Sequence, residues 1–392
     1  MPRDAVIVST ARTPIGRAYK GAFNATSGPT LGSLALKPAI ERAGIDAGEI
    51  DDVVWGTVLT QGTQFGNIGR QVALRAGCPV SVSGMTIDRQ CSSGLMAIAT
   101  AAKQIITDKM DVVAAGGQDS ISLVQTPEMR IAPDPSLIAM HKHVYMPMLQ
   151  TAETAARRYN ISRERQDEYA LKSQQRTAAA QAAGRFDDEI VPATTTMAMK
   201  DKDTGEVSMK EITVSRDEGN RADTTLEGLS GLNPVLGPDT SITAGNASQL
   251  SDGSSASILM EAGEAARRGL APMGRYVGMA VAGTEPDEMG IGPIDAELPS
   301  DSWLAFPAVI DVSGPRTGLS PDRPSRVVSA RLPSSLDTVI SRCETSLVSL
   351  STTFMVVVTG TISASKRPSA CAAAVRCWLF SAYSSCRSRL MP

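Results

Sequence analysis

The sequence predicts a mixed α/β layered fold, because short β-branched runs alternate with segments of helical apolar spacing over residues 1–120. The composition supports a packed core: 42% of the 392 residues are hydrophobic and 20% are charged, which excludes a disordered chain. At about 100–200 residues per domain, this length predicts two or three domains, or one large layered unit.

The first strand is expected at residues 5–9, a short β-branched run before the turn at Pro14. Gly44 and Gly77 stand where the first two helices should end. The helix that follows Cys91 has apolar residues on all sides and few charges, which predicts that it is buried. The spacing places the next strands at 52–56, 82–88 and 111–115, and the helices at 31–43, 66–77 and 91–109.

A more polar segment at residues 121–243 interrupts this alternation and is expected to be an inserted loop domain. Within it, helices are expected at 151–159 and 162–183, the second capped by Ser162. A hairpin is expected around Asp203-Thr204-Gly205. The core should then return at 241–244, followed by a small polar loop and a helix through Met260.

Composition excludes several classes of function. The net charge is −3 and no Lys/Arg cluster is present, so nucleic acid is not an expected partner. The apolar runs are far shorter than the roughly 18–20 residues of a membrane helix. The first residues lack the pattern of a signal peptide, and six cysteines in 392 residues are not a disulfide framework. The sequence therefore predicts a soluble cytoplasmic protein.

The composition changes near residue 294. The last 100 residues contain only 3 of the 33 glycines, one lysine (Lys366), no asparagine and no histidine, but 19 serines and nine arginines. They also contain four of the six cysteines: Cys343, Cys371, Cys377 and Cys386. A domain boundary can shift composition in this way, and so can a wrong reading frame of a GC-rich gene.

Cys91 is the sharpest candidate for chemistry. It lies where a predicted strand leads into the long helix, in the run DRQCSSGL. The positive end of a helix dipole favours the thiolate, which is the nucleophilic form. Small neighbours let a substrate carbonyl approach, and free backbone N–H groups can stabilise an oxyanion. The alternative is a small buried apolar residue, which is the role expected for Cys78.

A base for Cys91 is harder to find. The two histidines, His141 and His143, lie in an irregular segment beside a lysine, and residues at i and i+2 do not face each other on a helix. We expect neither a Cys–His pair nor a metal site from them. The loop at 245–248 suits close approach by an anion or an amide ligand, or is an ordinary turn. By position alone, Arg221 and the acids near it are solvated charges.

Several motifs in order resemble the thiolases, the acetyl-CoA acyltransferase family, over residues 1 to about 293. The resemblance covers roughly three quarters of the chain. Its matching pieces are VIVSTARTPIGR at 6–17, DRQCSSGLMAI at 88–98, TAE at 151–153, QDEYALKSQQ at 166–175, AGRFDDEIVP at 183–192, 224–229, and TAGNASQLSDG at 243–253.

The resemblance implies a five-layered α-β-α-β-α fold of two similar halves. It divides the chain into a first half at 1–120 and 244–268, the inserted loop domain at 121–243, and the position of the second half at 269–392, recognisable only to about 293. It also implies a homodimer or homotetramer. The reaction is thiolytic cleavage of 3-ketoacyl-CoA, or Claisen condensation of acetyl-CoA, with no permanently bound cofactor and with coenzyme A as substrate or product.

The same resemblance assigns individual residues. Cys91 matches the nucleophile that becomes acylated. Arg221, Ala244 and Ser248 match positions that contact CoA, and Met148 matches a loop residue that lines the acyl pocket. The glycine that usually follows this methionine is Leu149 here, which puts the shape of the pocket in question.

The last quarter departs from the family. A thiolase second half supplies an Asn-Glu-Ala-Phe, a Gly-His-Pro and a Cys-x-Gly motif, and none of them is in this sequence. They provide an oxyanion-hole water, the base for the nucleophile, and the acid/base at the α-carbon. A gene rearrangement or frame error, a sequencing artefact, or a divergent domain would each explain the difference.

The chain as written is therefore expected to lack turnover. Two alternatives remain open: another Cys acyltransferase of the same fold, and a non-catalytic CoA-binding subunit.

Overall fold

A computed structural model describes residues 3–129, 132–297 and 310–311. Its centre is a mixed eight-stranded sheet in the order β10-β9-β1-β8-β5-β3-β4, with β2 paired to β8. β3 is parallel to both β4 and β5, whereas β8 is antiparallel to both β1 and β5. The strands are β1 (Ala5–Arg12), β2 (Gly16–Arg17), β3 (Asp52–Gly56), β4 (Ser83–Ile87), β5 (Val112–Ser120), β8 (Ser251–Glu261), β9 (Gly274–Tyr276) and β10 (Ile310–Asp311).

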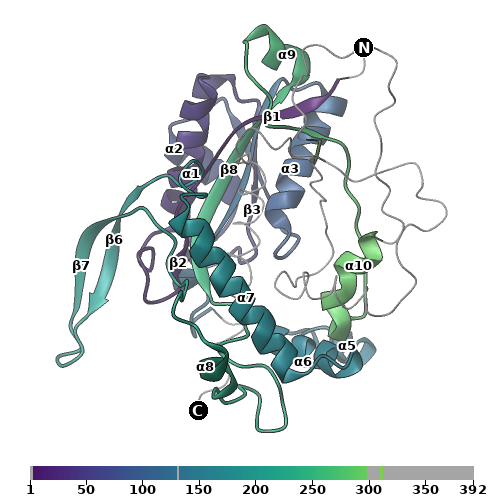
Figure 1. Cartoon of the computed structure of the whole chain (residues 1–392). Helices are drawn as coiled ribbons and strands as arrows, with labels where there is room; N and C mark the ends of the chain where they lie inside the picture. Colours follow the sequence, from purple (N-terminus) through teal and green to yellow (C-terminus); the bar gives the residue numbers. More distant parts are fainter. Residues whose placement is uncertain (1–2, 130–131, 298–309, 312–392) are drawn as a thin grey trace.

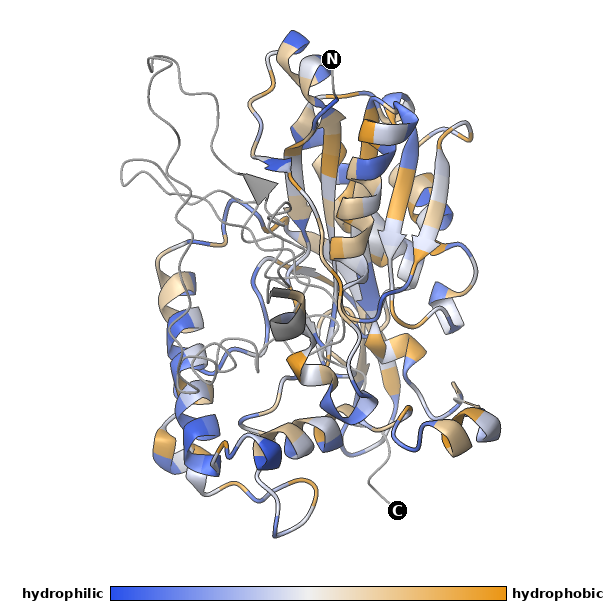
Figure 2. Ribbon diagram, turned by 90° about the vertical axis from the view of Figure 1, so that its right-hand side faces the viewer, coloured by the Kyte–Doolittle hydropathy of each residue, from blue (hydrophilic) through white to orange (hydrophobic). Residues whose placement is uncertain are grey.

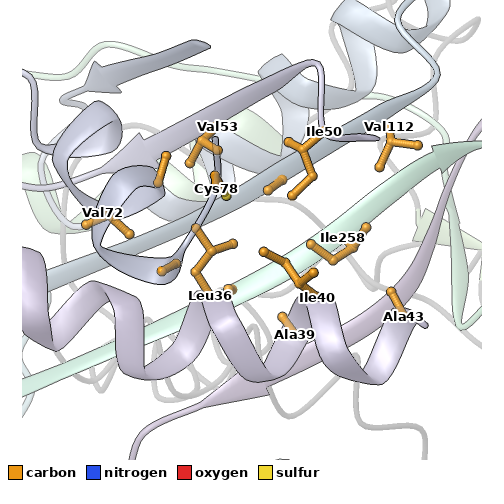
Figure 3. Packing of buried hydrophobic residues seen from close by; sticks show 14 of the residues in the cluster. Leu36, Ala39, Ile40, Ala43, Ile50, Val53, Val72, Cys78, Val112 and Ile258 are labelled. Carbon is orange, nitrogen blue, oxygen red and sulfur yellow. The ribbon is translucent and has the colours of Figure 1, made fainter. Parts of the chain in front are cut away.

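Helices cover both faces of the sheet (Figure 1). α1 (Gly28–Ala43) and α2 (Ile68–Ala76) lie on one face, and α3 (Ser93–Lys103) lies on the other. Neighbouring residues of one strand point to opposite faces, so Val53 packs under α1 and α2 while Val54 packs under α3. Figure 3 shows the first of these cores, in which Leu36 and Ile40 meet Ile258 of β8.

Figure 2 shows hydrophobic residues along the strands and mixed hydrophobic and polar stretches on the surrounding helices. This is the distribution expected when a sheet is buried on both faces and each helix is buried on one.

Most expected boundaries agree with the structure. Gly44 and Gly77 adopt the left-handed conformation directly after α1 and α2, with φ of 65° and 99°, which glycine accepts without strain. The Ser162 side chain caps α7 (Arg163–Ala182) by accepting a hydrogen bond from the amide of Arg165. The buried helix predicted after Cys91 ends as α3 at Lys103, and a single wide turn continues it over Gln104–Asp108.

The prediction of a helix through Met260 is wrong, because residues 251–261 form the central strand β8. Ala256, Ile258 and Met260 face α1 and α2, whereas Leu259 faces α3. This alternation is not evident in the sequence, because serines occupy several of the buried positions of the strand. They are tolerated in a buried strand because their hydroxyls bond to the backbone, as Ser254 does to the carbonyl of Leu31 at 2.6 Å.

The strand expected at 111–115 is longer than predicted, since β5 continues through Gly116 and Gly117 to Ser120. Gly116 has no Cβ, and a Cβ there would lie 2.4 Å from the Trp55 ring of β3. Gly116 therefore makes room for Trp55, the largest fully buried side chain of the described residues, and does not end the strand.

The residues between β5 and β8 form helices and one hairpin outside the sheet. The hairpin of β6 (Ala193–Lys200) and β7 (Val207–Val214) extends away from the core on the left of Figure 1. The helices between β5 and β8, besides α7, are α4 (Ile121–Val124), α5 (Pro135–Met140), α6 (Met148–Arg158) and α8 (Leu226–Ser230).

After β8 the chain forms α9 (Ala262–Arg267), a short helical turn at Pro286–Ile291, and α10 (Gly292–Glu297). The predictions for residues 298–392 lie outside the described residues, apart from β10. In the described ranges, no helix is long and apolar enough to cross a membrane.

Candidate active site

Cys91 lies in a tight turn between β4 and α3. It is only 6% exposed, and α3 begins two residues later with Ser92 as the residue before its first turn. Gln90, directly before the cysteine, has a φ of 48°, which is uncommon for a residue other than glycine. Such local strain often persists at functional sites, where the surrounding structure holds it in place.

The turn is held by its own polar groups. The Asp88 carboxylate accepts from the Gln90 amide at 2.6 Å and from the Ser93 hydroxyl at 3.5 Å. The amides of Ser92 and Ser93 donate to the carbonyls of Arg89 and Gln90. The expectation of free N–H groups beside the cysteine is therefore wrong for Ser92 and Ser93. Burial raises the pKa of Asp88.

The start of α3 is packed tightly against the end of β3. A Cβ on Gly56 would lie 2.5 Å from the Ser93 carbonyl carbon and 2.7 Å from the Gly94 nitrogen. Gly56 thus allows the backbone of α3 to approach β3 closely, and this contact fixes where the helix begins relative to Cys91.

Cys78 has the opposite setting. It follows the C-terminus of α2, where its amide donates to the carbonyl of Ala73 at 3.0 Å, and its side chain packs in the apolar core. Burial raises the pKa of the Cys78 thiol, and the negative end of the α2 dipole also disfavours a thiolate there. The described chain therefore contains two buried cysteines, and only Cys91 precedes a helix.

Arg221 is exposed, but its backbone is firmly held. Its amide donates to the Gln174 side chain of α7 at 2.9 Å, and Gln174 also accepts from the Asn220 amide group at 2.9 Å. Its carbonyl accepts from Thr224. An anchored backbone with a solvent-facing guanidinium is a suitable arrangement for binding a phosphate.

The acids before Arg221 are not simply solvated, contrary to the sequence-based expectation. Asp217 accepts a two-pronged hydrogen bond from the guanidinium of Arg12, at 2.6 and 2.9 Å. Arg12 is buried and also donates to Glu189 at 2.7 Å. Glu218 accepts from the Arg17 amide at 2.8 Å. These bonds attach the segment before Arg221 to the end of β1 and to β2. The bonded residues are about 200 positions apart in the sequence, so no local pattern indicates the contacts.

The loop 243–248, with exposed Ala244 and half-buried Ser248, is organised by Asn246. The Asn246 side chain accepts from the Thr243 amide at 2.7 Å and donates to Asp167 of α7 at 3.0 Å. Asp167 is buried and also accepts from Arg163 at 2.7 Å. Asn246 therefore holds the loop in shape. Gly253 and Ser255, a few residues further on, lie in β8.

The loop with Ser248 and the segment with Arg221 contact each other. The Gln249 side-chain amide donates to the carbonyl of Gly219 at 3.2 Å. Gly219 has a φ of 93°, and a Cβ there would lie 2.8 Å from the Gln249 side-chain oxygen. Two predicted CoA-contact positions, Arg221 and Ser248, are thus each within two residues of one shared hydrogen bond.

Met148 and the histidines belong to another part of the structure. Met148 is the first residue of α6 and is half-buried, as is Leu149. His143 lies 3.3 Å from Asp287, which also binds Arg158 at 2.8 Å. The described residues contain no cluster that could hold a metal ion.

Two carboxyl groups are buried, although the sequence gives no indication of their burial. Asp119 at the end of β5 accepts from Thr57, Val58 and Gln64, but its second oxygen has no hydrogen-bond partner. Burial raises its pKa to about 6. Burial also raises the pKa of Asp252 in β8 to about 7, although Ser122 donates to it twice. Both acids stand among small and polar residues in the sequence, which gives no signal of such burial.

Comparison with known proteins decides the family. Residues 5–263 match the family described as the N-terminal domain of thiolase. The chain belongs to the thiolase family. The 3-ketoacyl-CoA thiolase of Bacillus subtilis is 42% identical over 296 residues, which cover 75% of each chain. The acetyl-CoA acetyltransferase of Rhizobium meliloti is 39% identical over 302 residues, 74% of each chain.

A solved structure agrees. The crystal structure of the Bacillus anthracis acetyl-CoA acetyltransferase superposes with a TM-score of 0.64 at 39% identity, covering 75% of this chain and 74% of that one. The predicted thiolase-type fold is confirmed, and so is membership of an acyltransferase family. The described residues supply a helix layer, the sheet and the α3 layer, and the other two predicted layers lie outside them.

Proposed function

We propose that this thiolase-family chain accepts an acyl group from acyl-CoA on Cys91, and that the chain as written does not complete a catalytic cycle. The observation that carries the first part is the setting of Cys91, in a strained turn ahead of α3. The positive end of the helix dipole stabilises the thiolate there.

The half-reaction is a thioester exchange. The Cys91 thiolate attacks the carbonyl carbon of the acyl-CoA thioester, and the new carbon–sulfur bond forms as the bond to CoA breaks. CoA leaves as a thiolate and takes up a proton from solvent. The acyl group remains on Cys91 until CoA, or the α-carbon of a second acyl-CoA, attacks it.

Arg221, Ala244 and Ser248 are proposed to contact CoA, and Met148 to line the acyl pocket. In support, the backbone of Arg221 is fixed while its cation faces solvent. The loop at 243–248 is held by Asn246 and not by the side chains assigned to the ligand. CoA is then a substrate or product, and no permanently bound cofactor is needed.

The second part of the proposal rests on the sequence. Residues after 246 contain no asparagine and residues after 143 no histidine, so the groups that a thiolase second half supplies are missing together. Removing a single oxyanion donor costs about 10²–10³ in rate. We therefore expect acylation without thiolysis, and a homodimer or homotetramer only if residues 269–392 form a second half after the loop domain at 121–243.

Acylation is tested by incubating the purified chain with acetyl-CoA and measuring its intact mass. We expect the added mass of one acetyl group, mapped by peptide analysis to Cys91 and lost in Cys91→Ser. Cys78→Ser is the matched control and should acylate like the wild type. Acylation that survives Cys91→Ser would reject the assignment of the nucleophile.

A non-catalytic CoA-binding subunit is the second candidate, because the CoA-contact segments are well anchored whereas the turnover groups are missing. Calorimetry separates the two candidates: CoA binding with no acylation of Cys91 supports the binding subunit. A ketoacyl-synthase-like activity would instead require condensation of labelled acetyl-CoA without any thiolysis. The cytoplasmic location remains a prediction from the sequence.

A further inference from the structure

Two segments from distant parts of the sequence carry the proposed CoA contacts, and both are anchored to α7. The first, residues 217–221, is bound to β1 through Arg12 and Asp217 and to α7 through Gln174. The second, residues 243–249, is bound to α7 through Asn246 and Asp167. We call these the arginine segment and the serine loop.

The two anchors, Gln174 and Asp167, lie seven residues apart on α7, so this helix sets the coarse spacing of the two segments. A direct contact between the segments then refines their spacing close to the ligand-facing residues. Gln249 lies at the end of the serine loop, next to Ser248, and its side-chain amide donates to the carbonyl of Gly219 in the arginine segment. Gly219 lies two residues before Arg221, so this bond joins the two segments close to both ligand-facing residues.

The packing at this junction is close on both sides. Gly219 has a left-handed φ of 93°, and its missing side chain leaves the space that the Gln249 carboxamide occupies, since a Cβ would lie 2.8 Å from the Gln249 oxygen. Few residues other than glycine adopt this backbone conformation without strain. The backbone of one segment is therefore shaped to receive the side chain of the other.

We propose that Gln249 is a positioning residue that fixes the spacing between Arg221 and Ser248, and thereby sets the affinity of the site for CoA. This inference rests on the proposed function. Gln249 is exposed, so its side chain can be replaced without opening a cavity in the core. Preorganisation raises affinity because the ligand does not have to order the site when it binds.

The test uses two thioesters and three variants of the full chain. Acetyl-CoA needs both segments, whereas S-acetyl-N-acetylcysteamine lacks the nucleotide and needs only Cys91. Gln249→Ala removes the junction bond. Gln249→Glu has the same shape but cannot donate to Gly219, and it adds a negative charge near the phosphates of CoA. Gln175→Ala, at an exposed glutamine of α7, is the matched control.

We expect Gln249→Ala to weaken CoA binding, measured by calorimetry, by about 2- to 10-fold, the range expected for the loss of one hydrogen bond. Acylation by acetyl-CoA should weaken by the same factor. Acylation by the small thioester should not change. Gln249→Glu should bind CoA more weakly still, with part of the loss recovered at high salt, because salt screens the added charge. Gln175→Ala should match the wild type.

Two results would overturn the inference while leaving the proposed function intact. One is wild-type CoA binding in Gln249→Ala. The other is an equal loss with both thioesters, which would mean a general disturbance and not a change in the CoA site. A wild-type chain that binds no CoA would instead reject the proposed function, and the inference with it.

Discussion

Replacing Gly56 with alanine tests how the structure positions Cys91. The added Cβ would lie 2.5 Å from the Ser93 carbonyl carbon and 2.7 Å from the Gly94 nitrogen. Both are backbone atoms, so no flexible side chain can move aside, and α3 must shift away from β3. Overpacking of this kind costs about 1–3 kcal/mol, and contact with backbone places this site at the upper end.

The net effect is smaller than the clash. Alanine gains about 0.5–1 kcal/mol over glycine inside a strand, because it loses less conformational entropy on folding. We therefore expect Gly56→Ala to lower the free energy of unfolding by about 2 kcal/mol, close to a 30-fold change in the folding equilibrium. The rate at which iodoacetamide alkylates Cys91 should also change, because the helix start moves.

Urea unfolding followed by tryptophan fluorescence measures the first effect, and Trp55 of β3 is a buried reporter. Gly283→Ala is the matched control, since a Cβ there meets nothing within 4 Å. It should change stability by less than about 0.5 kcal/mol. If Gly56→Ala unfolds at the same urea concentration as Gly283→Ala, the close contact between β3 and α3 is not as described.

Three further predictions concern charge and reactivity. Iodoacetamide near neutral pH should alkylate Cys91 much faster than Cys78, because only Cys91 precedes a helix. Arg12→Met should lower the free energy of unfolding by about 3–5 kcal/mol, since two carboxylates lose a buried cation. Stability should fall as pH rises from about 4 to 7, because the folded state holds protons on Asp119 and Asp252 more tightly than the unfolded state does.

The pH dependence has a sign that can be checked. Below about pH 4 both folded and unfolded carboxyl groups are protonated, and the ordinary pKa of aspartate is close to this value. Between there and pH 7 the unfolded chain ionises first, so ionisation favours unfolding. For Asp119, with a pKa of about 6, the loss is about 3 kcal/mol. Urea midpoints of Asp119→Asn should vary less over this range than those of the wild type.

Each of these three has a contradicting result. Equal and slow alkylation of both cysteines would reject an activated Cys91. An Arg12→Met variant as stable as the wild type would show that Asp217 and Glu189 do not depend on the guanidinium. An Asp119→Asn variant whose stability varies with pH as much as that of the wild type would show that Asp119 does not titrate as described.

Much of the fold could be predicted from local sequence. Gly44 and Gly77 end their helices in the conformation that glycine favours, and Ser162 begins α7 as a side-chain cap. These signals depend on a few neighbouring residues. β8 could not be predicted in this way, because its serines hide the alternation and its partners β1 and β5 are more than a hundred residues away in the sequence.

The residues of the site also fall into those that local sequence predicts and those that depend on long-range contacts. Cys91 was recognisable because its strand, turn and helix are contiguous in sequence. The roles of Asp217 and Gln249 were not, since they depend on Arg12 and Gly219, and no local pattern reports such long-range pairing. For the same reason, two acids in polar surroundings gave no indication that Asp119 and Asp252 are buried.

The most direct test of the central claim measures both halves of the reaction on one preparation of the purified chain. One portion is mixed with acetyl-CoA, and the acylation of Cys91 is followed by mass spectrometry. The other portion is mixed with acetoacetyl-CoA and CoA, and the release of acetyl-CoA is followed by chromatography. We predict slow acylation of Cys91 and no detectable acetyl-CoA release by thiolysis. Thiolysis at an ordinary enzymatic rate, about 1–10³ s⁻¹, would contradict the account.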